Sequence, residues 1–197
     1  VSQIRLFPGP IVVDVDDPDF DSDLIDRLNN DRVVAVITTT KQLRIKLISE
    51  GLQPPCYVIP SGVDKQHNYQ DTAQQLRSLH PRESKEVRLG YAVPKLYMAE
   101  ELTGSRHSPE SMLRSIDWLL EMMQTVWLQN SEIELWLIGE TSNMVKRVCK
   151  NEKRIHLLGY IQYENILPYY SLFDIALYPR ATDVQGRHSI KLLEYMA

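Results

Sequence analysis

Two runs of consecutive apolar residues restrict the fold of this chain most strongly. Residues 32–40 are nearly all apolar and β-branched, and residues 134–138 form a second such run. Strands with this pattern are buried on both faces, which is typical of parallel sheets. A helix is expected over residues 41–50 and a strand over residues 56–59, and strand, helix and strand in this order form a right-handed crossover. We therefore expect an α/β protein with a Rossmann-like, open and mostly parallel sheet.

The same alternation of strands and helices continues along the chain. Further strands are expected at residues 11–15, 87–93, 155–161 and 173–179. Further helices are expected around Leu24, Ile25 and Leu28, within residues 65–85, and over residues 109–129, 143–150 and 164–172.

Side-chain periodicity predicts which helix residues face inward. In the helix over residues 41–50 we expect Leu43, Leu47 and Ile48 to be buried, with Gly51 ending the helix. In the segment 65–85 the buried residues should be Ala73, Leu76 and Leu79. Ser108 and Pro109 are typical of a helix start, and the Met and Trp stripe of the helix that follows indicates core. His156 lies in mid-strand, where we expect it to be packed rather than catalytic.

The last thirteen residues, 185–197, form a polar loop that runs into a helix. Ser189 is a plausible N-cap, so the amides of Ile190 and the next two residues would favour an anion in the preceding loop. Arg187, Lys191 and Glu194 share one helical face. Cations suit a diphosphate, whereas an ionised carboxylate accepts hydrogen bonds from sugar hydroxyls. An amphipathic helix with a solvated Lys191–Glu194 pair is the alternative interpretation.

The string Ser-Ile-Lys-Leu-Leu-Glu-Tyr-Met-Ala at residues 189–197 closely resembles a segment of the retaining glycosyltransferases of the GT-B fold, family four (glycosyl transferases group one). Three further stretches resemble the same family in the same order. They are the Pro-Ser-Gly-Val-Asp hinge at residues 60–64, the glycine after the third strand at Gly159, and the strand 173–179. The resemblance covers residues 31–197.

This resemblance implies an activity and a domain organisation. The implied enzyme moves a sugar from a nucleotide-diphosphate donor, such as a UDP- or GDP-sugar, to a saccharide or lipid acceptor with retention, as in polysaccharide biosynthesis. No metal and no cofactor other than the donor is implied. Residues 1–60 would be the remnant of the acceptor-side domain, residues 61–86 a hinge and linker, and residues 87–197 an incomplete nucleotide-sugar-binding domain. The chain would thus be the C-terminal half of a GT-B enzyme, truncated.

The resemblance also implies roles for individual residues. Glu194 would contact the ribose, and Ser189 and Ile190 would belong to the helix start that holds the diphosphate. The backbone after Gly159, at Tyr160 and Ile161, would line the base pocket. Lys191 and Arg187 would meet the charge of the departing diphosphate. Lys95 and Arg106 are the nearby cations in the expected loop 94–107 that could assist them.

Two positions differ from the common family pattern. The family carries two glutamates separated by seven residues, and Gly186 stands at the place of the first. The family's first strand of this domain ends in a pair such as Gly-Arg, whereas Gly90 is followed here by Tyr91. A catalytically inactive binding or assembly module that keeps the fold is therefore the alternative to the enzyme.

Other classes of function receive less support from the residues. Asp14, Asp16, Asp17 and Asp19 could serve a cation, but clustered aspartates also end strands. The first three of them offer half of a flavodoxin-like regulator's phosphorylation site. A dinucleotide-dependent oxidoreductase needs a GxGxxG motif after a strand, and the sequence has none.

Composition and chain ends add further expectations. The net charge of -4, with basic residues spread along the chain, argues against nucleic acid. Cys56 and Cys149 are expected to be free thiols. No apolar run approaches the roughly 18 residues that span a bilayer, so we expect a cytoplasmic protein, and peripheral contact with the inner face of the membrane stays open. The chain starts at Val1 and stops inside a helix, so we expect a fragment that binds donor weakly and does not turn over.

Overall fold

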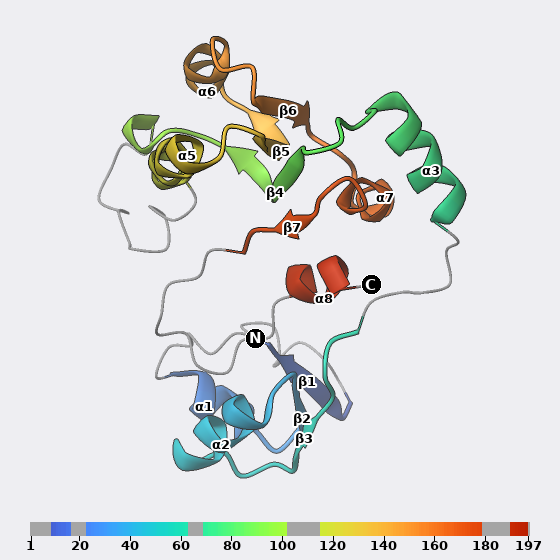
Figure 1. Ribbon diagram of the computed structural model, residues 1–197. Coiled ribbons are helices and arrows are strands. Elements are labelled where there is room, and N and C mark those ends of the chain that lie inside the picture. The colour runs from blue at the N-terminus through green and yellow to red at the C-terminus, as the bar shows by residue number, and fades with distance from the viewer. Residues whose placement is uncertain (1–8, 17–22, 63–68, 102–114, 179–189, 197) are drawn as a thin grey trace. The chain divides into compact units, whose positions relative to one another are not determined.

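The computed structural model describes residues 9–16, 23–62, 69–101, 115–178 and 190–196 (Figure 1). The chain divides into two compact units. Unit 1 comprises Val1–Val63 and Thr182–Leu193, and unit 2 comprises Asp64–Ala181 and Glu194–Ala197. The first boundary falls between Val63 and Asp64, inside the stretch that resembles a hinge.

Unit 1 is a small α/β unit with a parallel three-stranded sheet. Its strands are β1 (Ile11–Val15), β2 (Val33–Thr38) and β3 (Cys56–Val58), in the order β1-β2-β3. The helices α1 (Asp23–Leu28) and α2 (Lys41–Ser49) connect them. The core consists of Val15, Leu24, Ile25, Leu28, Val33, Val36, Leu43, Leu47 and Leu52. The expected crossover of strand, helix and strand is therefore present.

Helix α2 has the ends that its sequence predicts. The Thr40 hydroxyl accepts a hydrogen bond from the Leu43 amide at 3.1 Å, which caps the first turn. Gly51 has φ of +99°, and the Leu52 amide donates to the Leu47 carbonyl, as in a Schellman end. The prediction that Ile48 is buried was wrong, because the helix directs Leu43 and Leu47 inward and leaves Ile48 48% exposed.

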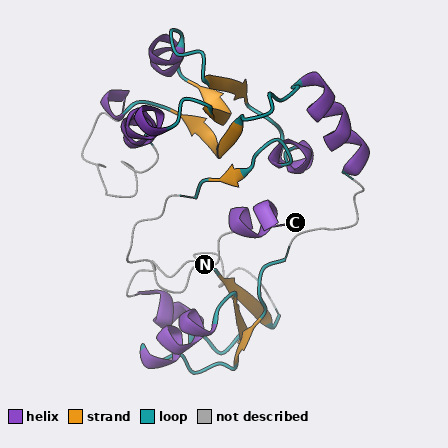
Figure 2. Ribbon diagram, in the orientation of Figure 1, coloured by secondary structure: helices purple, strands orange, loops and turns teal. Residues whose placement is uncertain are grey.

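Unit 2 is built on a four-stranded parallel sheet (Figure 2). Its strands are β4 (Val87–Leu96), β5 (Ile133–Thr141), β6 (Ile155–Gly159) and β7 (Ile175–Ala176), in the order β6-β5-β4-β7. The helices and 3-10 turns of unit 2 are α3 (Gln70–Leu79), η2 (Ala99–Glu101), α5 (Asp117–Gln129), α6 (Asn143–Cys149), η3 (Tyr163–Asn165) and α7 (Leu167–Tyr170). Helix α8 (Ile190–Met196) contributes its last residues to this unit.

Helices cover both faces of the unit 2 sheet. On one face, Leu89, Leu135 and Leu137 pack with α5 and α6. The opposite face has two clusters. Trp136 packs there with Leu76 of α3 and Leu172, and Ala92 and Ile138 pack with Tyr170 of α7 and Tyr195 of α8. A parallel sheet covered on both sides agrees with the unbroken apolar runs from which the fold was predicted.

Several predicted boundaries need correction. The helix expected over residues 109–129 begins at Asp117, because Ser115 forms a β-bridge with Tyr97; residues 102–114, including Arg106, Ser108 and Pro109, lie outside the described residues. The helix expected over residues 164–172 is split into η3 and α7. In α3, Ala73 and Leu76 are buried as predicted, but Leu79 at the helix end is 74% exposed.

Strand β4 is longer and less regular than its sequence predicted. Ala92 pairs with Ile138 of β5, and the next pair is Lys95 with Glu140. Between these pairs β4 runs three residues, whereas β5 runs two. This extra residue is a β-bulge. Gly139 has φ of +153°, and a Cβ there would lie 2.4 Å from the Val93 carbonyl oxygen. Lys95, predicted to lie in a loop, is therefore part of a strand.

A charged residue anchors the short strand β7 beside β4. The Asp174 carboxylate accepts hydrogen bonds from Arg82 at 2.8 and 2.7 Å and from the Arg88 amide at 2.8 Å. The Asp174 amide in turn donates to the Arg88 carbonyl at 2.9 Å. Asp174 is the aspartate of the strand 173–179 that resembles the family motif. Its hydrogen bonds to Arg82 and to the Arg88 amide explain why an aspartate stands at this position.

Candidate functional site

The carboxyl ends of the strands in unit 2 hold the candidate base-binding segment. Gly159 ends β6 with φ of +77°, a conformation that favours glycine. Tyr160 follows with a side chain 64% exposed, and Ile161 is half-buried against the cluster around Tyr170. The backbone after β6 is therefore turned out of the sheet where ligands of open α/β proteins bind.

Glu194 lies in the same part of unit 2. Its side chain is only 6% exposed, and its Oε2 atom accepts a hydrogen bond from the Tyr170 hydroxyl at 3.3 Å. The next residue, Tyr195, docks α8 on the sheet, since its hydroxyl accepts a hydrogen bond from the Ala92 amide at 3.3 Å. This amide lies on the edge of β4 beyond the end of β7. Glu194 thus lies near the carboxyl half of the sheet but is buried, whereas the predicted contact with a ribose requires an open carboxylate; that role stays a prediction.

Three tyrosines lie near this carboxylate, and the pKa of each is raised above its usual value. A hydrogen bond with Glu194 raises the pKa of Tyr163, which belongs to η3 just after β6. Burial, and then the charge of Glu194, raises the pKa of Tyr170. Burial also raises the pKa of Tyr195. All three phenols therefore stay neutral near pH 7 and can donate hydrogen bonds to the carboxylate or its ligands.

The predicted phosphate-binding cations fall on different parts of the chain. Lys95 is exposed on β4, and its partner in the ladder is Glu140 of β5, so a carboxylate stands beside it. Lys191 is half-buried on α8. Arg187, Arg106 and Ser189 lie outside the described residues, and Ile190 begins α8. The roles of these residues remain predictions.

The positions that differ from the family pattern can be placed in part. Gly90 and Tyr91 lie in the middle of β4 rather than at its end, because the strand continues to Leu96. Tyr91 is 3% exposed and packs edge-on against Trp118, with ring centroids 6.0 Å apart. The side chain after Gly90 therefore belongs to the core. Gly186 lies outside the described residues.

Metal-binding and thiol chemistry receive no structural support in the described segments. Asp14 and Asp16 are exposed, whereas Asp17 and Asp19 fall in the undescribed stretch 17–22. Across the described ranges, no three His, Cys, Asp or Glu residues are grouped so as to hold a metal ion. Cys56 and Cys149 are free thiols, and burial raises the pKa of Cys149 to about 11, which makes it an inert core residue.

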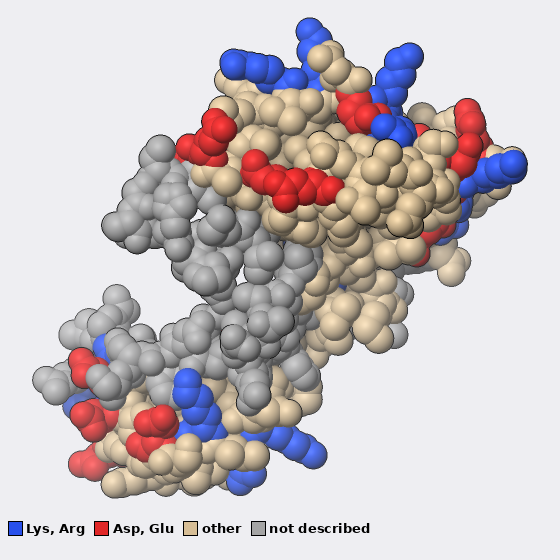
Figure 3. Space-filling view, turned by 60° about the vertical axis from the view of Figure 1, so that its left-hand side comes forward, with Lys and Arg blue, Asp and Glu red and all other residues tan. Residues whose placement is uncertain are grey.

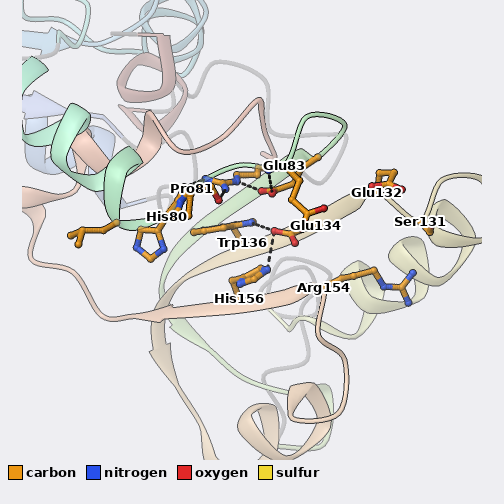
Figure 4. Close-up of a pocket in the computed structure, with 12 residues that line it drawn as sticks. His80, Pro81, Glu83, Ser131, Glu132, Glu134, Trp136, Arg154 and His156 are labelled. Carbon is orange, nitrogen blue, oxygen red and sulfur yellow. Dashed lines mark hydrogen bonds and ion pairs between the residues drawn. The ribbon is translucent and has the colours of Figure 1, made fainter.

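Sequence reasoning missed a pocket at the opposite, amino-terminal edge of the unit 2 sheet (Figure 4). The cavity has a volume of about 460 Å³. Its walls come from the end of α3 and from the first residues of β4, β5 and β6. Trp136 forms its centre, with the Arg88 guanidinium 4.4 Å from the ring centroid and the His156 ring stacked at 4.5 Å. His156 is thus packed, as predicted.

The polar groups of this amino-edge pocket are paired with one another. Arg88 and Glu86, both more than nine-tenths buried, form an ion pair, and Arg88 also donates to the carbonyls of His80 and Pro81. Burial alone would raise the pKa of Glu86, but hydrogen bonds from Arg88 and the Glu83 amide hold it below its usual value. Glu134 accepts a hydrogen bond from the Trp136 indole at 3.0 Å and lies 2.9 Å from His156 Nε2. The arrangement stabilises the sheet edge.

The visible surface shows no continuous basic stripe. On the face in Figure 3, Lys and Arg side chains alternate with Asp and Glu over the described atoms. Nucleic-acid-binding proteins usually gather their cations on one face. Within the described segments, no helix has both the length and the apolar character that crossing a bilayer requires.

Residues 105–197 match the family described as glycosyl transferases group 1. Among solved structures, the chain is similar to a point mutant of S. aureus TarM in complex with Fondaparinux, alpha-GlcNAc-glycerol and UDP, with a TM-score of 0.50 and 14% sequence identity. The likeness covers 85% of this chain and 31% of that chain, so this chain spans less than a third of TarM. A search of the curated proteins gives no match.

The matched segment includes β5, β6, η3, α7 and α8, which are the elements that carry Gly159, Tyr170 and Glu194. The parallel sheet covered by helices on both faces is the arrangement that the resemblance predicted. The predicted resemblance to the glycosyl transferases group 1 is supported over residues 105–197, which match that family, and the predicted Rossmann-like α/β fold is confirmed.

Proposed function

We propose that this chain is the donor-binding part of a retaining glycosyltransferase. It would bind a nucleotide-diphosphate sugar and pass the sugar to a saccharide or lipid acceptor. The observation that carries this proposal is the position of Glu194, whose buried carboxylate lies beside Tyr163, just after the turn at Gly159. The residues expected to meet the ribose and the base therefore belong to one neighbourhood of unit 2.

The proposed contacts follow from the chemistry of the groups. An ionised carboxylate accepts hydrogen bonds only, so Glu194 would receive the hydroxyl protons of a ribose. The backbone at Tyr160 and Ile161 would offer a donor and an acceptor to a base edge. Lys191, Arg187, Lys95 and Arg106 are the proposed cations for the departing diphosphate, whose developing charge each well-placed donor stabilises by about 3 kcal/mol.

A binding experiment tests this proposal directly. We expect UDP or GDP to bind the chain in isothermal titration calorimetry, and Glu194→Gln to weaken that binding about 10-fold or more, because a hydrogen bond to a charged group is lost. UDP is the first probe, since the TarM structure contains it. The matched control is Glu164→Gln, which removes an exposed carboxylate from η3 close to the same segment.

The second candidate is a non-catalytic module that keeps the fold. Buried Tyr91, at the position where the family carries a cation, favours it. Calorimetry separates the two functions. If neither nucleotide binds the wild-type chain while circular dichroism shows that it is folded, the module replaces the transferase.

A further inference from the structure

Tyr170 links the carboxylate of Glu194 to the sheet. Its hydroxyl donates to Glu194 Oε2 at 3.3 Å, and its side chain is 9% exposed. Its ring meets the ring of Tyr195 edge-on, with centroids 4.6 Å apart and an interplanar angle of 74°. The Tyr195 hydroxyl accepts from the Ala92 amide of β4. Strand, Tyr195, Tyr170 and Glu194 therefore form one chain of contacts.

The immediate surroundings of Glu194 have an unusual charge balance. In the part of the chain that the structure describes, no ion pair joins Glu194 to a lysine or arginine, and its hydrogen-bond donor is the Tyr170 hydroxyl. A buried carboxylate without a cation is costly unless hydrogen bonds satisfy its oxygens. Because Tyr170 supplies such a bond to one oxygen only, acceptor capacity remains on the carboxylate for a second group.

Packing holds this donor in place. Tyr170 is buried in α7, so its hydroxyl cannot move away from Glu194 without disturbing the core. A donor fixed in this way is suited to holding a side chain ready for a ligand.

We propose that Tyr170 is a positioning residue, which holds one oxygen of Glu194 so that the other can accept from a ligand diol. This inference rests on the proposed function, because the diol is the ribose of the donor nucleotide. Tyr170 touches no reacting atom; it acts through Glu194.

The test is a set of tyrosine-to-phenylalanine variants that remove one hydroxyl each and keep the rings. We expect Tyr170→Phe to weaken UDP or GDP binding roughly 10-fold, the size typical of a hydrogen bond to a charged group. Tyr169→Phe, one residue away in α7, is the matched control and should bind as wild type does.

A double-mutant cycle separates positioning from general damage. In a Glu194→Gln background, Tyr170→Phe should change the affinity by less than about 2-fold, since the residue acts through the carboxylate. An equal loss in both backgrounds would overturn the inference, as would a Tyr170→Phe affinity equal to that of Tyr169→Phe. In both cases wild-type binding and its loss in Glu194→Gln leave the proposed function intact. Absence of wild-type binding would overturn both.

A second modification guards against misfolding of Tyr170→Phe. Replacement of Tyr170 by 3-fluorotyrosine keeps the side-chain shape and makes the phenol a stronger donor. Burial raises the pKa of Tyr170, so the fluorinated phenol also stays protonated near pH 7. Tighter nucleotide binding is expected, and weaker or unchanged binding would contradict the positioning role.

Discussion

Gly90 lies in the middle of β4, under the ring of Phe173. A Cβ at this position would lie 1.9 Å from Phe173 Cδ2 and 2.0 Å from Cγ, far inside van der Waals contact. In the sequence, Gly90 is only the first residue of the Gly-Tyr pair that stands where the family pattern has Gly-Arg. In the structure, packing requires glycine at this position, because the ring of Phe173 occupies the space that a side chain would need. Phe173 begins the segment that leads into β7.

We expect Gly90→Ala to lower the free energy of unfolding of unit 2 by about 1–3 kcal/mol, because the extra methyl group forces Phe173 out of its place. Urea denaturation followed by tryptophan fluorescence measures the change. Phe173→Leu in the same chain should recover part of the loss. Gly62→Ala, where a Cβ meets nothing within 4 Å, is the control and should stay within about 0.5 kcal/mol of wild type. A Gly90→Ala protein as stable as this control would contradict the packing role.

Glu194 shows what residue patterns can and cannot predict about the site. The helical spacing placed it on α8 with Lys191, and the resemblance assigned it to a sugar. Neither could show that its hydrogen-bond partner would be Tyr170, 24 residues upstream in the chain. Side-chain partners across a fold depend on how α7 and α8 meet, and local periodicity carries no information about that.

At the scale of elements, sequence patterns located the described strands and helices but not all of their ends. Apolar runs identified β2 and β5. Both faces of β5 are covered, whereas Val34 of β2 is 50% exposed. Helix α5 begins at Asp117 because Ser115 pairs with Tyr97, a contact between segments that sequence spacing does not reveal. Strand β4 extends to Leu96 because β5 supplies a partner beyond the bulge. Tertiary pairing overrides local signals at such ends.

The attachment of β7 to β4 depends on Asp174, and this can be tested. Asp174→Ala removes three acceptor contacts, so we expect a loss of about 1–3 kcal/mol in unfolding free energy, moderated by the partial exposure of the Arg82–Asp174 pair. The Leu177 amide, which donates to the Gly90 carbonyl, should exchange with solvent faster. Native-state hydrogen exchange measures both effects.

The companion variant for this element is Arg82→Lys. A lysine keeps the charge but cannot make the forked pair of bonds to Asp174, so its stability should fall between wild type and Asp174→Ala. If Asp174→Ala left the Leu177 exchange rate unchanged, the carboxylate would not be what holds β7 to the sheet.

At the scale of the whole molecule, the chain has separate hydrophobic cores in its two units. We expect Leu47→Ala, fully buried in unit 1, to cost that unit about 2–5 kcal/mol through the cavity that it leaves. The matched change in unit 2 is Leu137→Ala, at a residue that is also fully buried. Hydrogen exchange resolved by residue reports the two units separately.

In each variant, exchange should accelerate in the unit that carries the substitution and stay near the wild-type rate in the other. Uniform acceleration along the whole chain in both variants would show that the two units unfold as one.

The bulge of β4 limits how this protein can move. Pro94 has no amide hydrogen to donate. On that edge of β4 the described pairing with β7 ends at Gly90, so Pro94 removes no hydrogen bond between these two strands. Gly139 leaves room for the Val93 carbonyl, where any larger residue would collide with it. A slip of β4 along β5 would bring a side chain against that carbonyl. The central strands are therefore held in register, and any rearrangement within unit 2 has to come from segments outside β4 and β5.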